Sequence, residues 1–170
     1  CSGRGYWALQ DLIQTLGIKN AVITQNGSQI TDETGEKILH EEMISVENCK
    51  KILSHCVKNG YHPLIYQKDN VYGSLQDQYL EIFERCMNQK VVYTDDIERT
   101  YAQVPLGKIL VLDEPERIRK IQNWMLEQFR GQVLAELAYD FSLEIGGSDK
   151  GKALEWLAGY YQIPREKILA

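Results

Sequence analysis

The sequence lacks several features that would assign it to a common functional class. None of its apolar stretches approaches the roughly 20 residues that a membrane-spanning helix requires, and no run of Lys and Arg is longer than two residues. With a formal net charge of −5, the chain shows no basic stripe of the kind that binds nucleic acid or anionic membranes. It contains neither the GxxxxGK[ST] loop nor the GxGxxG fingerprint of nucleotide-binding folds. A small anionic ligand remains compatible with this composition, because a few local cations suffice to bind one.

Cysteine and histidine are scarce, and neither is arranged for metal or redox chemistry. The four cysteines form no CxxC pair, and no His spacing completes a zinc site. Cys49 and Cys56 are seven residues apart on one expected helix face, so we interpret them as buried free thiols. No secretory signal is present, which favours a reducing, cytoplasmic location. The three histidines, His40, His55 and His62, are scattered, and we expect them to be structural or exposed.

Both ends of the chain have the pattern of an α/β core. Apolar residues at helical spacing predict a helix over 6–16, and the short apolar run 21–24 predicts a buried strand that ends before Asn26-Gly27. Near the other end, a Gly-rich turn leads into a helix that ends before Pro164, and the apolar run 167–170 predicts a new strand. We therefore expect the chain to be an interior portion of a longer α/β protein.

The middle of the sequence has a different pattern, which predicts strands and helices in roughly equal measure. Alternating polar and apolar residues around Thr34-Gly35 and Asp69-Asn70 predict two hairpins. Further helices are predicted over 46–59, 74–88 and 114–129, and further strands at 90–94, 108–113 and within 132–145. These elements predict a self-contained α+β domain over 29–141, inserted between the core segments 1–28 and 142–170.

Cations stand at two expected helix starts, where the positive end of the helix dipole makes them unfavourable. Arg4 precedes the first helix and Lys150 begins the last, and glycines adjoin both. A helix start, close backbone approach and a misplaced cation together suit a phosphate site. Each feature also has an ordinary explanation: Ser2 could be an N-cap, Asn26-Gly27 a type I′ turn, and Lys150 a solvated lysine.

The order of these segments resembles the haloacid dehalogenase-like superfamily, and most closely its Cof-type hydrolases. The stretch "SGRGYWALQDLIQTLG…ITQNGS" is similar to that branch's "TGR…LG…ITxNGA", and "LEIGGSDKGKALEWLAGYYQI…ILA" to its "LEI…xxKGxAL…LaxxxgI…ViA". The resemblance is specific at both ends and covers the middle only by architecture. It implies an α/β fold, with a partial Rossmann-like core and an inserted α+β cap domain over 29–141.

The resemblance also implies roles for individual residues. Ser2 is expected to hydrogen-bond the transferring phosphoryl group, and Lys150 to neutralise the charge of nucleophile and phosphate. Asn26 and Gly27 match the family's asparagine-glycine loop beside the active site. The list of expected phosphate- or substrate-binding residues is completed by Gly3 and Arg4.

Two motifs of the family are absent from the 170 residues. The DxD element would supply the aspartate nucleophile, and the GDxxND loop would help to hold Mg²⁺. We expect no metal ligand in this chain, no activity of the chain alone, and a Mg²⁺-dependent parent phosphatase acting through an aspartyl-phosphate. Its expected partner is a small phosphorylated metabolite such as a sugar phosphate. A non-catalytic binding or regulatory module and a phosphomutase on the same scaffold are the alternatives.

In such an architecture, polar side chains of the cap would select the substrate. The candidates lie near expected strand ends and loops, although a solvated sheet face is the simpler explanation for each of them. They are Tyr66, Asp69, Tyr72, Arg99 and Tyr101.

Overall fold

The computed structural model describes residues 1–169, whose contacts divide the chain into two compact units. The first unit combines Cys1–Glu42 with the segment from Ser148 onward, and the second comprises Met43–Gly147. The second unit is thus an insertion into the first. No helix within residues 1–169 is long and apolar enough to cross a membrane.

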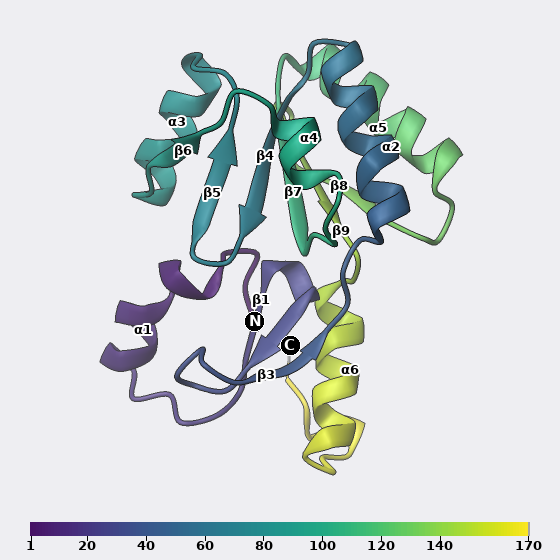
Figure 1. Ribbon diagram of the computed structural model, residues 1–170. Helices are drawn as coiled ribbons and strands as arrows, with labels where there is room; N and C mark the ends of the chain where they lie inside the picture. The colour runs from purple at the N-terminus through teal and green to yellow at the C-terminus, as the bar shows by residue number, and fades with distance from the viewer. Residues whose placement is uncertain (170) are drawn as a thin grey trace. The chain divides into compact units, whose positions relative to one another are not determined.

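The first unit is built on a three-stranded antiparallel sheet in the order β1-β2-β3 (Figure 1). β1 (Val22–Thr24) pairs with β2 (Gln29–Thr31), and β2 pairs with β3 (Ile38–Glu41). The remaining elements of this unit are helical: η1 (Tyr6–Ala8), α1 (Gln10–Thr15), η2 (Gln25–Gly27), α6 (Lys150–Tyr160) and η3 (Arg165–Lys167).

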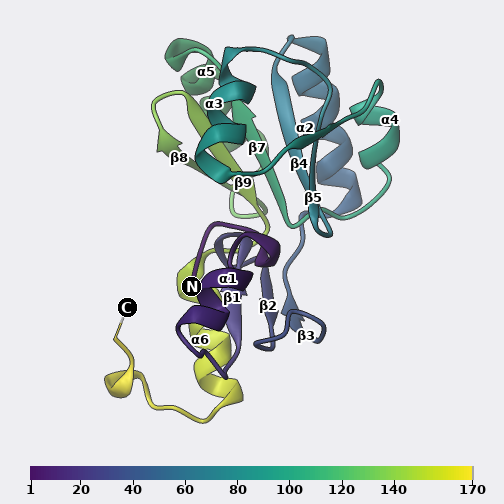
Figure 2. The same cartoon turned by 90° about the vertical axis from the view of Figure 1, so that its left-hand side faces the viewer.

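The helices α1 and α6 cover opposite faces of β1 (Figure 2). Successive strand residues point to opposite faces of a sheet. Val22 accordingly packs with Leu9 and Ile13 beside α1, whereas the next residue, Ile23, packs with Ala153 of α6. The positions of both helices in this unit are therefore set from the same short strand.

The observed boundary of the inserted unit differs from the one expected from the sequence. Residues 29–42 belong to the first unit rather than to the insertion, because β2 and β3 form a sheet with β1. At the other end, residues 142–147 belong to the second unit, because β9 (Ser142–Gly146) lies between two of its strands. Strand pairing, which the sequence pattern does not specify, decides both boundaries.

The second unit contains a six-stranded sheet in the order β6-β5-β4-β7-β9-β8. All neighbours are antiparallel except β5 and β6, which are parallel. Besides β9, its strands are β4 (His62–Gln67), β5 (Asn70–Gly73), β6 (Val91–Tyr93), β7 (Lys108–Leu112) and β8 (Leu134–Tyr139). Its helices are α2 (Val46–Lys58), α3 (Gln78–Met87), α4 (Ile97–Tyr101) and α5 (Pro115–Gln128).

The core of the second unit lies between this sheet and the helices α2 and α5. Ile52 of α2 and Ile121 of α5 are fully buried in one apolar cluster with Ile65, Ile109 and other strand residues. Burying one such side chain contributes roughly 1.5–3 kcal/mol to stability. This unit therefore has an extensive apolar core of its own.

Most predicted elements are present, with three differences. The first predicted helix is divided into η1 and α1, and the short helix α4 was not predicted. A strand was expected at 167–170, but Ile168 and Leu169 are not in a strand. Residue 170 lies outside the described residues. A strand requires a hydrogen-bonded neighbouring strand. In the sheets formed by residues 1–169, no strand pairs with Ile168 or Leu169.

Candidate functional site

The N-terminal loop of the first unit runs beside the end of β1. The backbone N–H of Ser2 donates to the carbonyl of Ile23 (2.9 Å), and the carbonyl of Ser2 accepts from the N–H of Asn26 (3.1 Å). The carbonyl of Arg4 accepts from the N–H of Gln25 (2.9 Å). Three backbone hydrogen bonds thus tie residues 2–4 to the strand end, so the place of Ser2 is fixed independently of its side chain.

The hydroxyl group of Ser2 does not cap a helix. Its Oγ accepts a hydrogen bond from the backbone N–H of Arg4 (3.1 Å), and the residue preceding η1 is Gly5. The N-cap interpretation of Ser2 is therefore wrong. A serine hydroxyl has one proton and two lone pairs, so the bond from Arg4 leaves the proton of Ser2 to be donated to another group.

The connection from β1 to β2 has an uncommon backbone. Thr24 and Gln29 are paired, which leaves a four-residue connection rather than a two-residue type I′ turn. Gln25, Asn26 and Gly27 have φ angles of 50°, 59° and 103°. Runs of left-handed backbone are unfavourable for residues other than Gly and Asn. Such strain persists only where the surrounding structure determines it, and it occurs often at functional sites.

The N-terminus of α6 is capped by Asp149, and Lys150 is its first residue. The carboxylate of Asp149 accepts from the backbone N–H of Lys152 (2.8 Å), and its carbonyl accepts from the N–H of Ala153 (3.1 Å). The amides of Lys150 and Gly151 belong to the first turn, where a helix leaves N–H groups without intrahelical partners. The side chain of Lys150 is exposed. The helix start thus presents amides and an ammonium group together.

Two glycines bring these three segments into contact. A Cβ atom on Gly3 would lie 2.5 Å from Oδ1 of Asn26. A Cβ atom on Gly27 would lie 2.5 Å from the carbonyl carbon of Asp149 and 3.0 Å from the backbone nitrogen of Lys150. The loop of residues 2–4, the turn of residues 25–27 and the start of α6 are therefore neighbours in the first unit.

Arg4 is placed differently from the expectation. It precedes the 3₁₀ turn η1 and not an α-helix, since α1 begins only at Gln10. The ring of Trp7 occupies the space that a side chain on Gly5 would need, and the backbone of Gly5 is extended. Arg4 is exposed, so its guanidinium is available to an anion, but no helix dipole opposes it.

Within residues 1–169, no group of three or more His, Cys, Asp and Glu side chains is arranged to hold a metal ion. Magnesium prefers several oxygen ligands in octahedral geometry, and these residues do not provide them. Residues 1–169 therefore do not fit a magnesium site.

Two histidines and two cysteines of the second unit are engaged in packing or pairing within it. His55 stacks on Trp124 with the ring centroids 3.6 Å apart, and His62 pairs with Asp77 through Nδ1 and Oδ2, 2.5 Å apart. Burial raises the pKa of the Cys49 thiol to about 11 and that of Cys56 to about 12. These two thiols are therefore protonated at neutral pH and unsuited to nucleophilic attack.

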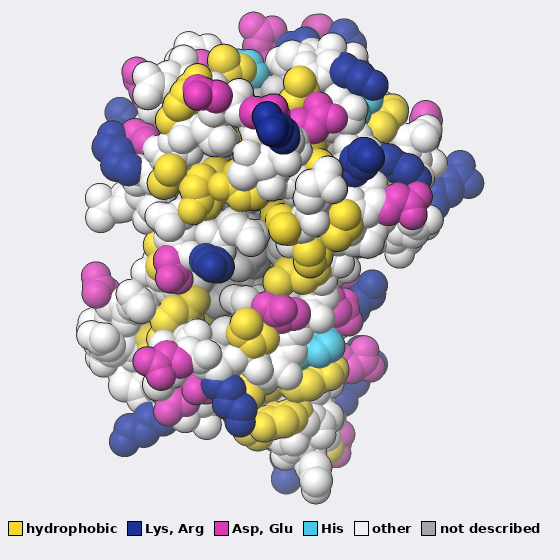
Figure 3. All heavy atoms as spheres, viewed as in Figure 1, with side chains coloured by type: hydrophobic (Ala, Val, Ile, Leu, Met, Phe, Trp, Pro, Cys, Tyr) yellow, Lys and Arg dark blue, Asp and Glu magenta, His cyan; other side chains and the backbone are white. Residues whose placement is uncertain are grey.

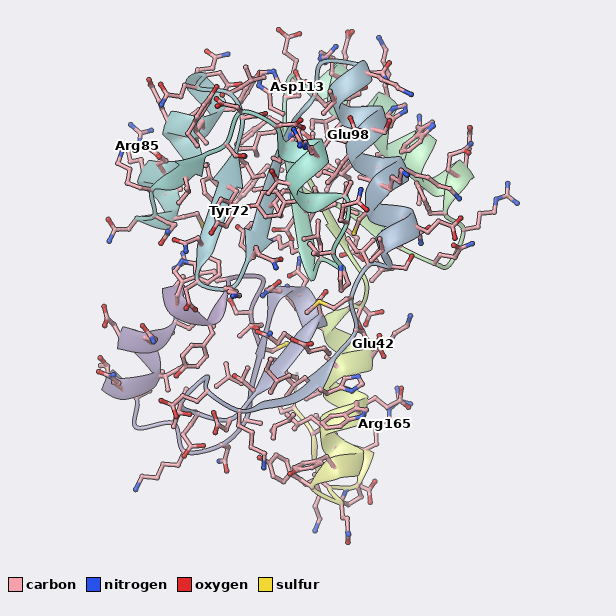
Figure 4. The ribbon with its side chains drawn as sticks, in the orientation of Figure 1. Glu42, Tyr72, Arg85, Glu98, Asp113 and Arg165 are labelled. Carbon is pink, nitrogen blue, oxygen red and sulfur yellow. The ribbon has the colours of Figure 1, made fainter. Side chains whose placement is uncertain are left out.

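The side chains of His40 and Glu42 lie near one another in the first unit. Nε2 of His40 is 3.5 Å from Oε1 of Glu42, which is labelled in Figure 4, and the His40 ring stacks on Trp156 of α6 with centroids 4.4 Å apart. On the face seen in Figure 3, Lys and Arg are interspersed with Asp and Glu. That face carries no continuous basic surface.

Of the five residues considered for substrate selection, three are parts of packed clusters. Tyr66 and Tyr101 are buried, and Tyr72, labelled on β5 in Figure 4, contacts Tyr101 with ring centroids 5.0 Å apart. Asp69 and Arg99 are exposed. The packing of the three tyrosines accounts for them without a ligand, whereas the two charged residues remain candidates.

The first unit brings together several groups that can donate hydrogen bonds to an anion. A hydroxyl donor at Ser2, amides in the first turn of α6 and the ammonium of Lys150 are the donor types that hold phosphate oxygens. Nearby, residue Ser148 is 2% exposed, and its buried hydroxyl has no hydrogen-bond partner among the described residues. Leaving such a group unsatisfied costs about 1–3 kcal/mol, so a polar ligand or water there would be favourable. We call the residues 2–4, 25–27 and 149–151 the phosphate cradle.

Sequence reasoning did not find two features of this cradle. Asp149 was not recognised as the N-cap of α6, although Asp directly before an apolar periodic segment is a standard signal. The approach of Gly3 to Asn26 gives no sequence signal, because the distance between them depends on how the loop returns to the strand.

Known proteins resemble the chain over its whole length. The sequence model of a family described as haloacid dehalogenase-like hydrolase matches residues 1–170. The phosphatase YwpJ of Bacillus subtilis is 24% identical over 196 residues, an alignment that covers 99% of this chain and 68% of YwpJ.

Two solved structures show a similar fold. The structure of TM0651 from Thermotoga maritima has a TM-score of 0.84 and 23% identity, and the match covers 98% of this chain and 64% of that one. The sugar phosphatase BT4131, described as a subclass IIB member of the superfamily, has a TM-score of 0.76 and 15% identity, with 97% and 62% covered. The chain thus spans a little under two thirds of these structures, and its architecture is that of their Rossmann-like core with an inserted domain.

Proposed function

We propose, because this chain belongs to the haloacid dehalogenase-like hydrolase family, that the whole protein is a phosphatase of small phosphorylated metabolites. The contact of the Ser2 loop, the Asn26-Gly27 turn and the first turn of α6 carries the proposal. Sugar phosphates are the favoured substrate class, because the structurally similar BT4131 is described as a sugar phosphatase.

In this proposal, Ser2 donates a hydrogen bond to an oxygen of the phosphoryl group. The N–H of Arg4 already occupies one lone pair of its Oγ, which orients the hydroxyl so that its proton points elsewhere. The backbone bonds of residues 2–4 to the end of β1 hold the hydroxyl in place. Donors fixed before the reaction need no reorganisation as charge develops on the phosphoryl oxygens.

Lys150 supplies positive charge at the same group. Its ammonium has three donors and acts as a compact point charge, and the adjoining amides of α6 add the partial positive charge of a helix start. The carboxylate of Asp149 is engaged with Lys152 N–H. Phosphoryl transfer depends mainly on positioning and on electrostatic stabilisation of the equatorial oxygens, which these groups provide.

The attacking group is not among these donors. The family resemblance implies an aspartate nucleophile, an aspartyl-phosphate intermediate and Mg²⁺, and the motifs that would supply the nucleophile and the metal ligands are absent from the 170 residues. We propose that the chain of 170 residues alone has no phosphatase activity and that the second unit serves the whole protein as a substrate-selecting cap.

The test is phosphate release by the whole protein. Purified protein with Mg²⁺ should release inorganic phosphate from p-nitrophenyl phosphate and from at least one sugar phosphate in a panel, and a chelator should stop the release. Absence of release from every substrate, with the protein folded, would refute the phosphatase assignment and favour a binding or regulatory module. With a hexose phosphate, an isomeric product in place of free phosphate would indicate a phosphomutase.

A further inference from the structure

Gly27 occupies a backbone conformation that other residues rarely adopt. Its φ angle of 103° lies outside even the small left-handed region open to Asn, near 50–70°. It is also buried. The backbone conformation at this position therefore favours glycine over every other residue.

The missing side chain of Gly27 allows α6 to approach the turn. A Cβ atom at this position would meet the carbonyl oxygen of Asp149 and would lie 3.0 Å from the nitrogen of Lys150. These are backbone atoms, which cannot swing aside as the end of a flexible side chain can. The carbonyl oxygen of Asp149 also accepts the N–H of Ala153, so moving it would disturb the first turn of the helix.

A second close approach lies on the other side of the same turn. A Cβ atom on Gly3 would be 2.5 Å from Oδ1 of Asn26, and the carbonyl of Ser2 already accepts the Asn26 N–H. Asn26 therefore contacts the Ser2 loop, while Gly27, the next residue, contacts the start of α6. The two contacts join segments that are more than a hundred residues apart in the sequence.

We propose that Asn26-Gly27 is a spacer that sets the separation between the Ser2 loop and the first turn of α6. Gly27 then acts as a positioning residue for Lys150 and touches no substrate itself. The inference rests on the proposed phosphatase function for its kinetic consequence, but the spacing is a property of the fold. Phosphate held by both Ser2 and Lys150 would require this separation to be kept closely, since displacements of about 1 Å can cost about a hundredfold in rate.

The test compares Gly27→Ala with Gly17→Ala in the whole protein. Gly17 also has a positive φ angle, of 61°, but a Cβ atom there would meet nothing within 4 Å. Both variants place alanine at a positive φ angle, 103° at Gly27 and 61° at Gly17, and only the Cβ atom of Gly27→Ala would also push on α6. We expect Gly27→Ala to lower kcat for p-nitrophenyl phosphate at least tenfold and to weaken inhibition by inorganic phosphate. Gly17→Ala should change neither value by more than about twofold.

Urea unfolding midpoints show whether each variant is folded under the assay conditions. A folded Gly27→Ala with wild-type kcat and wild-type phosphate inhibition would overturn the inference. If Gly27→Ala does not fold, Gly3→Ala replaces it, because Gly3 has no positive φ angle and its Cβ would press on the Oδ1 atom of Asn26, which is buried and has little room to move. Gly3→Ala should then lower kcat at an unchanged unfolding midpoint, and unchanged kcat would overturn the inference equally.

A structural measurement separates this inference from the proposed function. Amide hydrogen exchange of residues 150–153 should accelerate in Gly27→Ala and remain as in the wild type in Gly17→Ala. If the wild-type protein releases no phosphate from any substrate, the proposed function fails while the exchange result still decides the spacing. Equal exchange in both variants would refute the spacer whatever the activity.

Discussion

Replacing Lys150 by alanine removes an ammonium group from the first residue of α6 and leaves the backbone of that helix start unchanged. The side chain is exposed, so its removal opens no cavity. A cation at a helix N-terminus is unfavourable by about 0.3–1 kcal/mol, and alanine is the best helix former. We therefore expect the free energy of unfolding to stay within about 0.5 kcal/mol of wild type, or to rise slightly.

The effect on turnover should be far larger. If Lys150 stabilises charge on the phosphoryl group, its loss resembles the removal of one donor from an oxyanion site. Such removals lower kcat by about 10²–10³-fold, or about 2.7–4 kcal/mol of transition-state stabilisation. The ratio of the kinetic to the stability effect is what separates a phosphate ligand from an ordinary surface lysine.

Lys152→Ala is the matched control. Lys152 is exposed in the same helical turn, and its contribution to the cap is made by its backbone N–H, which alanine retains. Both variants remove one positive charge, so any general effect of net charge on substrate attraction appears in both. Steady-state kinetics with p-nitrophenyl phosphate and urea unfolding of the whole protein give the two quantities. Equal, small kinetic effects in both variants, or an unfolded Lys150→Ala, would refute the assignment.

Other predictions concern the second unit. Arg117→Ala removes hydrogen bonds to the carboxylate of Asp113 and to the carbonyls of Asn59 and Gly60, which follow α2. We expect it to lower the free energy of unfolding by about 1–2 kcal/mol. The control Arg119→Ala, at an exposed residue, should lower it by less than about 0.5 kcal/mol. At pH 8, iodoacetamide should modify Cys49 and Cys56 only after unfolding, because burial raises their pKa to about 11 and about 12; rapid labelling in the folded protein, seen by peptide mass mapping, would contradict this. Burial lowers the pKa of His55 below its ordinary 6.5. Below about pH 6.5 the unfolded chain therefore binds a proton at His55 more readily than the folded protein does, and the free energy of unfolding should decrease as the pH is lowered. Urea unfolding between pH 5.5 and 8 measures this slope, which His55→Gln should reduce.

The sequence was sufficient to predict the elements whose signals are local. The helix α2, for example, follows from its apolar stripe and ends before Gly60, whose φ angle is 64°. Hairpins at Thr34-Gly35 and at Asp69-Asn70 follow from turn residues between alternating segments. These features depend on residues a few positions apart. The unusual position of Lys150 could also be predicted locally, because a cation at an expected helix start opposes the helix dipole.

The features that sequence reasoning missed depend on distant residues. Whether 29–42 belongs to the first unit is decided by the pairing of β2 with β1, and the short helix α4 is fixed by burial of Ile97 and Tyr101 more than by its own length. A five-residue helix is too short to be stable alone. Strands find their pairing partners, and helices their packing surfaces, only in the folded chain, so no local sequence pattern predicts these contacts.

The same distinction explains which residues of the cradle could be assigned and which could not. Arg4 and Lys150 were identifiable as cations where a helix start was expected, although Arg4 in fact precedes a 3₁₀ turn. Gly3 and Gly27 break no rule in the sequence, because glycine is ordinary in turns; their significance comes from what a side chain would meet. A phosphate site needs both kinds of residue, since charge stabilises the phosphoryl group only at the distance that the backbone contacts maintain. The cations can be exchanged and assayed one at a time, whereas the glycines affect the geometry of every donor in the cradle at once. A glycine substitution here should therefore weaken the interactions of Ser2 and Lys150 with phosphate together.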